Sequence, residues 1–183
     1  ILILSHFDED HTGGTEMLLD KNLVENIIIN RKESRNKTFE SIINSKAKIY
    51  YPVENTPLII NRDLKIEFFN VKPDEYKESN DSSLVVLITY KDKKILFTGD
   101  ASYNIEDELA EYIGYIDLLK VSHHGSESST SENFVYSIRP KYSIISVGKN
   151  NSYGHPSKKV LKNLNNVNSK ILRTDLEGEI IFK

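Results

Sequence analysis

The sequence predicts a mixed α/β protein in which sheets and helices pack together as a sandwich. Short apolar runs alternate with segments of helical periodicity along its 183 residues. One pair of apolar runs flanks a short polar turn, as in a β-hairpin, whereas other strands are separated by helices. This mixture, without an internal repeat or a linker, favours layers of sheet and helix around one core. The length suits one domain, so we expect residues 1–183 to form a single domain.

The composition is that of an ordinary globular chain, with 38% hydrophobic and 28% charged residues and a net charge of −3. The chain contains no apolar run near the roughly 18 residues of a membrane span and no basic, apolar-cored leader. The absence of cysteine excludes disulfides, thiolate metal ligands and a cysteine nucleophile. The charge provides no bulk attraction for nucleic acid, so a phosphate substrate would need metal ions or a local basic patch.

The N-terminal half alternates between strands and helices. The apolar run Ile1–Leu4 predicts a buried strand, and Gly13-Gly14 precedes a short helix at Thr15–Asn22. A second helix is predicted over Ser34–Ser45. Further strands are predicted at Asn26–Asn30, Lys48–Val53, Leu58–Ile60 and Leu64–Val71. Because Ile1 rather than methionine opens the chain inside a strand-like run, we expect a fragment whose N-terminal part is missing.

The C-terminal half begins with a hairpin. Ser83–Tyr90 and Lys94–Thr98 flank the turn Lys91-Asp92-Lys93, and a helix at Ile105–Tyr112 ends near Gly114. The strand Asp117–Ser122 runs into a pair of histidines. The remaining predicted elements are helices at Ser131–Ser137, capped by a serine or threonine, and Pro156–Leu164, and strands at Tyr142–Val147, Lys170–Leu172 and Glu179–Phe182.

A dense polar cluster, SHFDEDHTGG, follows the first strand directly. His6, Asp8, Asp10 and His11 are close enough in sequence to converge on one small volume. Imidazole and carboxylate groups are both metal ligands, and together they hold divalent ions without thiolate. The two glycines then allow a tight turn into a helix. The alternative interpretation is a solvated acidic turn, which the two histidines beside a buried strand disfavour.

Three more polar clusters follow strands. Asp100 comes just after the run ILFTG, where a carboxylate can bridge two cations or simply cap a turn. His155 lies in a loop before a helix, where it is either a proton donor or a phosphate contact, or a loop histidine bonded to its own backbone. The third cluster is the pair His123-His124. Side chains alternate across a strand, so if strand geometry persists only one of them faces the cleft, and we favour His123 as the ligand.

These residues resemble a known family. The pattern His6-x-Asp8-x-Asp10-His11-x-Gly-Gly resembles the His-x-His-x-Asp-His signature of the metallo-β-lactamase superfamily, with Asp8 replacing the second histidine. The order of motifs is similar to one branch, the C-terminal β-lactamase-like domain of ComEC-type competence proteins. The segments that carry this likeness are NDSSLVVLI (80–88), TGD (98–100), SHHGS (122–126), NSYGHP (151–156) and KILRTDLEGEIIF (170–182).

The resemblance implies an αββα sandwich with two divalent metal ions in a cleft at the sheet edges, and hydrolysis by a metal-activated water. It implies that the N-terminal strands of the first sheet are missing here. The residues it assigns to metal are His6 and Asp8 at the first site, Asp10, His11 and either His123 or His124 at the second, and Asp100 as the bridge. The residues it places against the substrate or behind the ligands are His124, Ser126 and Asn80, with Asp81 beside the first site.

The oxygen-rich ligand set shifts the expected metal toward Mn²⁺ or Mg²⁺, with Zn²⁺ as the alternative. Asp10 is also a candidate to orient the attacking water, and His155 or the spare histidine to protonate the leaving oxygen. Two groups of basic residues are candidate contacts for a polyanion, or simply solvated helix faces. They are Arg31, Lys32, Arg35 and Lys37, and Lys158, Lys159 and Lys162.

The expected function is that of a phosphodiesterase or nuclease degrading one DNA strand during competence DNA uptake. The expected partners are single-stranded DNA and the rest of a membrane-embedded channel, without membrane contact by this fragment. A ComEC-type domain would lie on the extracellular face of the plasma membrane, and a free-standing enzyme in the cytoplasm. The alternatives are a metallo-hydrolase of another phosphodiester or ester, and a non-catalytic module that recognises DNA.

Overall fold

The computed structural model describes residues 1–30, 36–71 and 79–182. The strands are β1 (Leu2–Leu4), β2 (Asn26–Ile29), β3 (Lys48–Tyr50), β4 (Leu58–Asn61), β5 (Leu64–Phe69), β6 (Val85–Tyr90), β7 (Lys93–Phe97), β8 (Leu118–Lys120), β9 (Tyr142–Ile145) and β10 (Lys170–Arg173). The helices are α1 (Glu9–Thr12), α2 (Thr15–Asp20), α3 (Lys37–Ile43), α4 (Tyr103–Ile113), α5 (Glu132–Ile138), α6 (Lys158–Asn166) and α7 (Thr174–Glu177). Two 3₁₀ turns are η2 (Asn80–Ser82) and η3 (Ser122–Gly125). The predicted mixed α/β class is confirmed.

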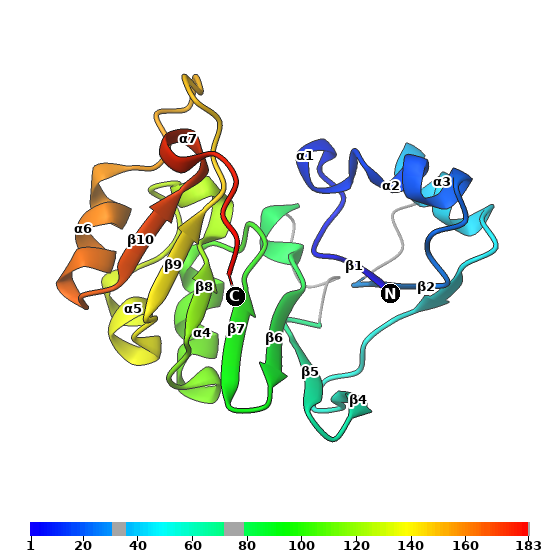
Figure 1. Cartoon of the computed structure of the whole chain (residues 1–183), viewed down its shortest axis with the longest axis horizontal. Helices are drawn as coiled ribbons and strands as arrows, with labels where there is room; N and C mark the ends of the chain where they lie inside the picture. Colours follow the sequence, from blue (N-terminus) through cyan, green and yellow to red (C-terminus); the bar gives the residue numbers. More distant parts are fainter. Residues whose placement is uncertain (31–35, 72–78, 183) are drawn as a thin grey trace.

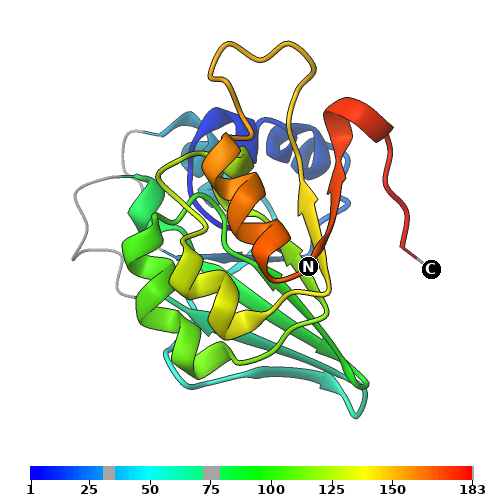
Figure 2. The same ribbon diagram turned by 90° about the vertical axis from the view of Figure 1, so that its left-hand side faces the viewer.

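The strands form two sheets. A parallel sheet has the order β1-β2-β3, and a larger sheet has the order β10-β9-β8-β7-β6-β5-β4. Strands β4 to β7 pair antiparallel, and the predicted hairpin joins β6 to β7. Strands β7 to β10 pair in parallel, because helices connect them and return the chain to the same edge. Helices α4, α5 and α6 cover one face of the larger sheet (Figures 1 and 2).

The two sheets are layered between helices, and the alternation of side chains along single strands shows this arrangement. In β2, Ile27 and Ile29 pack with α2 and α3, whereas Ile28 packs between the sheets. In β6, Val85 and Leu87 belong to the core beneath α4, α5 and α6. Val86, the residue between them, lies in the inter-sheet core. Three apolar cores therefore separate four layers in the order helix, sheet, sheet, helix.

Short polar residues begin three of the helices. Asn36 caps α3 by accepting a hydrogen bond from the Phe39 N–H, and Ser131 caps α5 in the same way. Ser157 caps α6. The predicted helix over 34–45 therefore begins at Lys37, and positions 34 and 35 lie outside the described residues. The described helices include none long and apolar enough to span a bilayer.

Two elements differ from the sequence-based expectation. The polar segment after β1 contains the short helix α1 and is not all loop. The predicted strand at Glu179–Phe182 is wrong, since these residues have no regular structure. The chain instead turns into α7 at the sheet edge, where Arg173 donates two hydrogen bonds to the Asp175 carboxylate. The Phe182 ring then packs edge-on against Tyr142, with centroids 5.1 Å apart, so side-chain contact holds the tail.

The carboxyl ends of β1, β7 and β8 meet at one edge of the two sheets. Strands β7 and β8 are parallel neighbours, so the residues that follow them emerge side by side. A hydrogen bond of 2.8 Å from the Leu84 N–H to the Ser5 carbonyl ties the smaller sheet to the larger one at this edge. Polar side chains far apart in sequence are thereby brought together.

Candidate metal centre

The segment after β1 presents its residues alternately to the core and to the sheet edge. Phe7 is buried and packs edge-on against Phe39, with ring centroids 5.8 Å apart. Its neighbours His6 and Asp8 point away from that core because side chains alternate along an extended chain. Asp8 then serves as the N-cap residue of α1, which carries Asp10 and His11. The first turn of a helix favours carboxylates, so the acidic run also suits this position.

Asp100 follows β7 through a glycine that no other residue replaces without strain. Gly99 has a φ of +57°, and a Cβ at this position would lie 2.8 Å from both Cβ and Oγ of Ser83. This close approach allows the Asp100 N–H to donate to Ser83 Oγ at 3.0 Å. The same oxygen lies 3.2 Å from Nδ1 of His6. Ser83 therefore links the backbone of Asp100 to the ring of His6.

The tandem histidines do not continue strand β8. His123 and His124 have φ values of 45° and 53°, in the left-handed region, within the turn η3. The premise that their side chains alternate across a strand is wrong, because the backbone leaves extended geometry at Ser122. Both rings line the same cleft. Gly125 completes the turn, and its φ of +83° brings its backbone against Pro156, where a Cβ would lie 2.6 Å from the proline Cβ.

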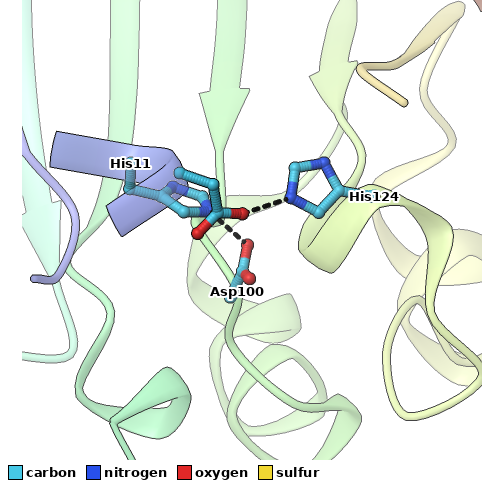
Figure 3. Close-up of side chains that lie close together, drawn as sticks. His11, Asp100 and His124 are labelled. Atoms are coloured by element: carbon cyan, nitrogen blue, oxygen red, sulfur yellow. Dashed lines mark hydrogen bonds and ion pairs between the residues drawn. The ribbon is translucent and has the colours of Figure 1, made fainter. Parts of the chain in front are cut away.

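Four residues form what is called here the four-ligand cluster: Asp10, His11, Asp100 and His124. One ligand atom from each lies within 4.8 Å of all the others. His11 Nε2 is 3.0 Å from Asp100 Oδ1, and His124 Nε2 is 3.0 Å from Asp10 Oδ2. Figure 3 shows His11, Asp100 and His124 converging from separate elements. The spacing allows a single ion to be shared by all four side chains.

The hydrogen bonds within the four-ligand cluster favour a cation between its members. His124 Nδ1 lies 2.6 Å from the Ser146 carbonyl, an acceptor, so Nδ1 carries a proton. In the neutral ring Nε2 then presents a lone pair to the Asp10 carboxylate, which is repulsive unless a proton or cation lies between them. His11 Nε2 and Asp100 Oδ1 are buried, and within the described part of the chain neither has a hydrogen-bond partner of proper geometry. Such orphaned atoms fit a divalent ion.

His6 and Asp8 form a second pair of donors beside this cluster. His6 is 3% exposed, and its ring centroid lies 4.3 Å from that of His11. Its Nε2 is 3.6 Å from Asp8 Oδ2 and has no hydrogen-bond partner among the described residues. Ser79 donates a hydrogen bond of 2.8 Å to the other oxygen of Asp8. Outer contacts of this kind orient the ligands of a metal site.

The charges of the site shift the pKa values of its members in opposite directions. Burial, and then the charge of His11, lower the pKa of His6. Burial also acts to lower the pKa of His11, but the contact with the Asp100 carboxylate and its negative charge outweigh burial and raise this pKa above 6.5. Burial acts to raise the pKa of Asp100, but His11 and then His123 and His6 lower it to about 2. Without a bound ion, the Asp100 carboxylate therefore favours the protonated form of His11 at the place where a cation would bind.

Other predicted site residues lie at different distances from the cluster. His123 Nε2 is 3.7 Å from Asp100 Oδ2, whereas His11 contacts the other oxygen of this carboxylate. His155 lies with its ring centroid 5.8 Å from that of His123, in a cleft of about 510 Å³ that Asp8, Asp10 and Asp100 also line. Burial, and then the charges of His123 and His124, lower the pKa of His155.

Ser126, Asn80 and Asp81, which the sequence placed near the site, form hydrogen bonds with residues outside the four-ligand cluster. Ser126 bonds to Ser128 through its hydroxyl, and its N–H closes the histidine turn by donating to the His123 carbonyl. Asn80 begins η2, and its carbonyl accepts from the Ser83 N–H. The neighbouring Asp81 accepts from the Ser102 N–H. These three residues brace the backbone around the site.

The predicted basic patches are placed in part. Lys158, Lys159 and Lys162 are exposed on α6. Lys37 is exposed on α3, where its Nζ lies 3.8 Å from Glu16 Oε1. Arg31, Lys32 and Arg35 lie outside the described residues.

Sequence reasoning missed three residues of the site. Ser83 is fully buried between η2 and β6, and its residue type alone carries no signal for its role. Lys120 ends the otherwise apolar β8, and its ammonium donates to the Val121 carbonyl at 3.0 Å near Asp100 and Asp10. A lysine at the end of an apolar strand could have indicated from the sequence that polar groups lie nearby. Burial lowers the pKa of Lys120 despite these carboxylates. The third residue, Tyr153, lines the cleft beside His155.

The four-layer fold and the cluster of carboxylate and imidazole donors define the class of metal-dependent hydrolases with an αββα sandwich. A family model described as the metallo-beta-lactamase superfamily matches residues 1–149. The chain belongs to the metallo-β-lactamase superfamily, as the motifs predicted.

Curated relatives narrow the resemblance. ComE operon protein 3 of Bacillus subtilis (strain 168) is 33% identical over 187 residues, which cover 100% of this chain and 24% of that protein. Recombination protein 2 of Haemophilus influenzae is 28% identical over 179 residues, which cover 98% of this chain and 21% of that protein. These relatives are ComEC-type competence proteins, so the predicted resemblance to that branch is confirmed. The chain spans about a quarter or less of their length.

Solved structures share the fold at low sequence identity. CmlA, a diiron β-hydroxylase from Streptomyces venezuelae, superposes with a TM-score of 0.65 at 12% identity, covering 94% of this chain and 43% of that one. The metallo-beta-lactamase fold protein YhfI from Bacillus subtilis superposes with a TM-score of 0.59 at 13% identity, covering 93% and 72%. At these identities the likeness shows the fold alone, and it confirms the predicted sandwich.

Proposed function

We propose that the chain is a metal-dependent phosphodiesterase that hydrolyses single-stranded DNA, as one domain of a larger DNA-uptake protein. The observation that carries the proposal is the four-ligand cluster, whose donor atoms lie within 4.8 Å of one another beside an open cleft. The competence proteins among its relatives support DNA as the substrate. We further propose that the parent protein carries this domain on the outer face of the plasma membrane.

The donor set supports two ions, either Mn²⁺ or Zn²⁺. Asp10, His11, Asp100 and His124 would hold one ion, and His6 with Asp8 would hold the other, with Asp100 between them. His124 is preferred over His123 here, because its Nε2 lies in the cluster and its Nδ1 is anchored on the Ser146 carbonyl. Bound ions of this kind lower the pKa of a coordinated water and offset negative charge on phosphoryl oxygens.

We propose that two side chains, Asp10 and His155, move protons. The contacts of Asp10 with His11 and His124 both use Oδ2, so Oδ1 is available to orient the attacking water. His155 lines the same cleft, where its ring would protonate the leaving oxygen. The lowered pKa of His155 makes its protonated ring a stronger acid but leaves less of it protonated at neutral pH.

The test compares the chain with its Asp100→Ala variant, each supplied with Mn²⁺ or Zn²⁺, on a single-stranded oligonucleotide and on a small phosphodiester. Asp92→Asn, a change at the exposed β6–β7 turn, is the matched control. We expect the chain and the control to cut DNA and Asp100→Ala to lose cleavage while keeping its fold. Equal cleavage by all three proteins would remove Asp100 from the site. Hydrolysis of the small phosphodiester without DNA cleavage would leave a phosphodiesterase of another substrate.

A further inference from the structure

The ring of Tyr153 lies at the edge of the cleft and is largely exposed to solvent. It is 81% exposed, and it stacks on His155 with an interplanar angle of 20° and ring centroids 5.7 Å apart. Exposure alone is not unusual, since Tyr112 on α4 is 77% exposed. Tyr153 differs because it lines the same cleft as Asp10, Asp100 and His124.

The loop that carries Tyr153 is braced from within. The Asn151 side-chain amide donates to the His155 carbonyl at 2.7 Å, and the His155 N–H donates to Asn151 Oδ1 at 3.0 Å. The same amide donates to the Gly148 carbonyl at 3.2 Å. The loop between β9 and α6 protrudes from the body of the molecule, as Figure 2 shows. These hydrogen bonds brace the loop backbone that carries Tyr153 before a ligand arrives, which reduces the ordering cost of binding.

The surroundings of the ring indicate what it binds. The residues that line the cleft with Tyr153 are carboxylates and imidazoles, so no apolar neighbour there covers the exposed ring. A ligand that places a phosphate at the four-ligand cluster and a flat ring on Tyr153 would satisfy both parts of the cleft. A nucleotide of a single strand carries both groups one sugar apart, and bases stack on aromatic side chains without sequence preference.

We propose that Tyr153, backed by His155, is a stacking platform for a nucleobase next to the phosphodiester at the four-ligand cluster. The proposal rests on the proposed function, because it assigns part of that site's substrate. It adds a base-binding subsite with little sequence preference to a metal centre that recognises only phosphate. A strand whose bases are missing loses this contact and keeps every phosphate.

The experiment compares a thymidine 10-mer with an abasic 10-mer of equal charge, both with phosphorothioate linkages that resist cleavage. Dissociation constants are measured by fluorescence anisotropy on the Mn²⁺-loaded chain and four variants. Tyr153→Phe keeps the stacking ring, Tyr153→Leu keeps apolar bulk without a ring, and Tyr153→Ala removes both. Tyr112→Ala removes an equally exposed tyrosine on α4. A 2-aminopurine base placed in the strand provides a second measurement, since stacking quenches its fluorescence. The chain has no tryptophan, so no indole fluorescence overlaps this signal.

We expect the chain to bind the strand with bases about 5- to 150-fold more tightly, as for one base stacked on an aromatic ring. Tyr153→Phe and Tyr112→Ala should keep this preference, whereas Tyr153→Leu and Tyr153→Ala should reduce it toward unity. A preference near unity in the unaltered chain, a preference that survives Tyr153→Ala, or no binding of either strand would overturn the platform.

Hydrolysis of ordinary phosphodiester strands separates this proposal from the proposed function. Cleavage of both strands with no base preference in binding would leave the nuclease standing and remove the platform. A base preference that depends on Tyr153, without any hydrolysis, would support the platform in a DNA-recognition module and remove the nuclease.

Discussion

His11 and Asp100 face each other across 3.0 Å, and the two facing atoms are buried without a properly oriented hydrogen bond among the described residues. One residue lies on α1 and the other follows β7, 89 positions later in the chain. The Asp100 charge raises the pKa of His11 and so favours a proton on its ring, whereas a divalent ion would replace that proton. Protons and metal therefore compete for the same place.

The first prediction concerns this competition. Because the pKa of His11 is raised, metal affinity should fall as the pH falls through that raised value, above 6.5. The Asp100→Asn variant removes the carboxylate charge, so its His11 should titrate at lower pH. Histidine NMR titration of both metal-free proteins, with metal titration by calorimetry, measures the two effects. An unchanged His11 titration in Asp100→Asn would contradict the assignment.

The free energy of unfolding of the metal-free chain should depend on pH through two histidines whose contributions change in opposite directions. The raised pKa of His11 contributes stability that is complete below 6.5 and is lost as the pH rises through the folded value. The lowered pKa of His6 contributes stability above 6.5 that is lost as the pH falls. Because these contributions oppose each other, the difference between the chain and Asp100→Asn measures what the Asp100 charge contributes through all three histidines, His11 first. The shift of the Asp100 pKa from 3.8 to about 2 corresponds to about 2 kcal/mol of folding stability above pH 3.8. The pKa shift of His11 reports the same interaction, so its contribution is not added to this figure.

The second prediction concerns the glycine before Asp100. Gly99→Ala should destabilise the fold by about 1–3 kcal/mol or more, because the positive φ is strained for alanine and the added Cβ overlaps Ser83. The displaced Asp100 should also weaken metal binding. Gly148→Ala is the control, since its Cβ meets nothing within 4 Å. Urea denaturation measures both variants, and equal stability of the two would rule out the close approach.

The third prediction concerns Ser83. Ser83→Ala removes the hydroxyl that accepts from the Asp100 N–H and contacts the His6 ring, so metal affinity should fall by about 10- to 100-fold. Ser143→Ala is a matched control, because Ser143 is equally buried but bonds only to Ser169 among the contacts found for its hydroxyl. Both changes should lower stability, but only Ser83→Ala should change metal affinity. Calorimetric titration with Mn²⁺ distinguishes them.

The fourth prediction separates the tandem histidines. His124→Ala should lose one bound metal equivalent, because His124 Nε2 belongs to the four-ligand cluster. His123→Ala should retain more metal, because its Nε2 is 3.7 Å from Asp100 and lies outside that cluster. Elemental analysis of the two purified variants measures this difference. Greater metal loss in His123→Ala would restore the assignment that the sequence favoured.

Periodicity and residue type predicted much of the architecture. The apolar runs on either side of Lys91-Asp92-Lys93 predicted the hairpin that joins β6 to β7, and the structure then placed Val85 and Val86 in two different cores. Ser131 signalled the start of α5. The tail strand at Glu179–Phe182 failed because an apolar run does not reveal whether a neighbouring strand is present to pair with it. The local sequence pattern indicates the secondary structure that a segment prefers, but not whether the fold provides a strand for it to pair with.

The ligand types and their positions after strands were readable in the sequence, because metal chemistry needs particular side chains and parallel strands deliver them to one edge. The choice between His123 and His124 could not be predicted from the sequence, because it depends on two left-handed backbone conformations in η3. The contact of Ser83 with His6 spans 77 positions, and only tertiary packing brings them together. The sequence by itself determined which chemical groups meet, and the tertiary structure decided which atoms face one another.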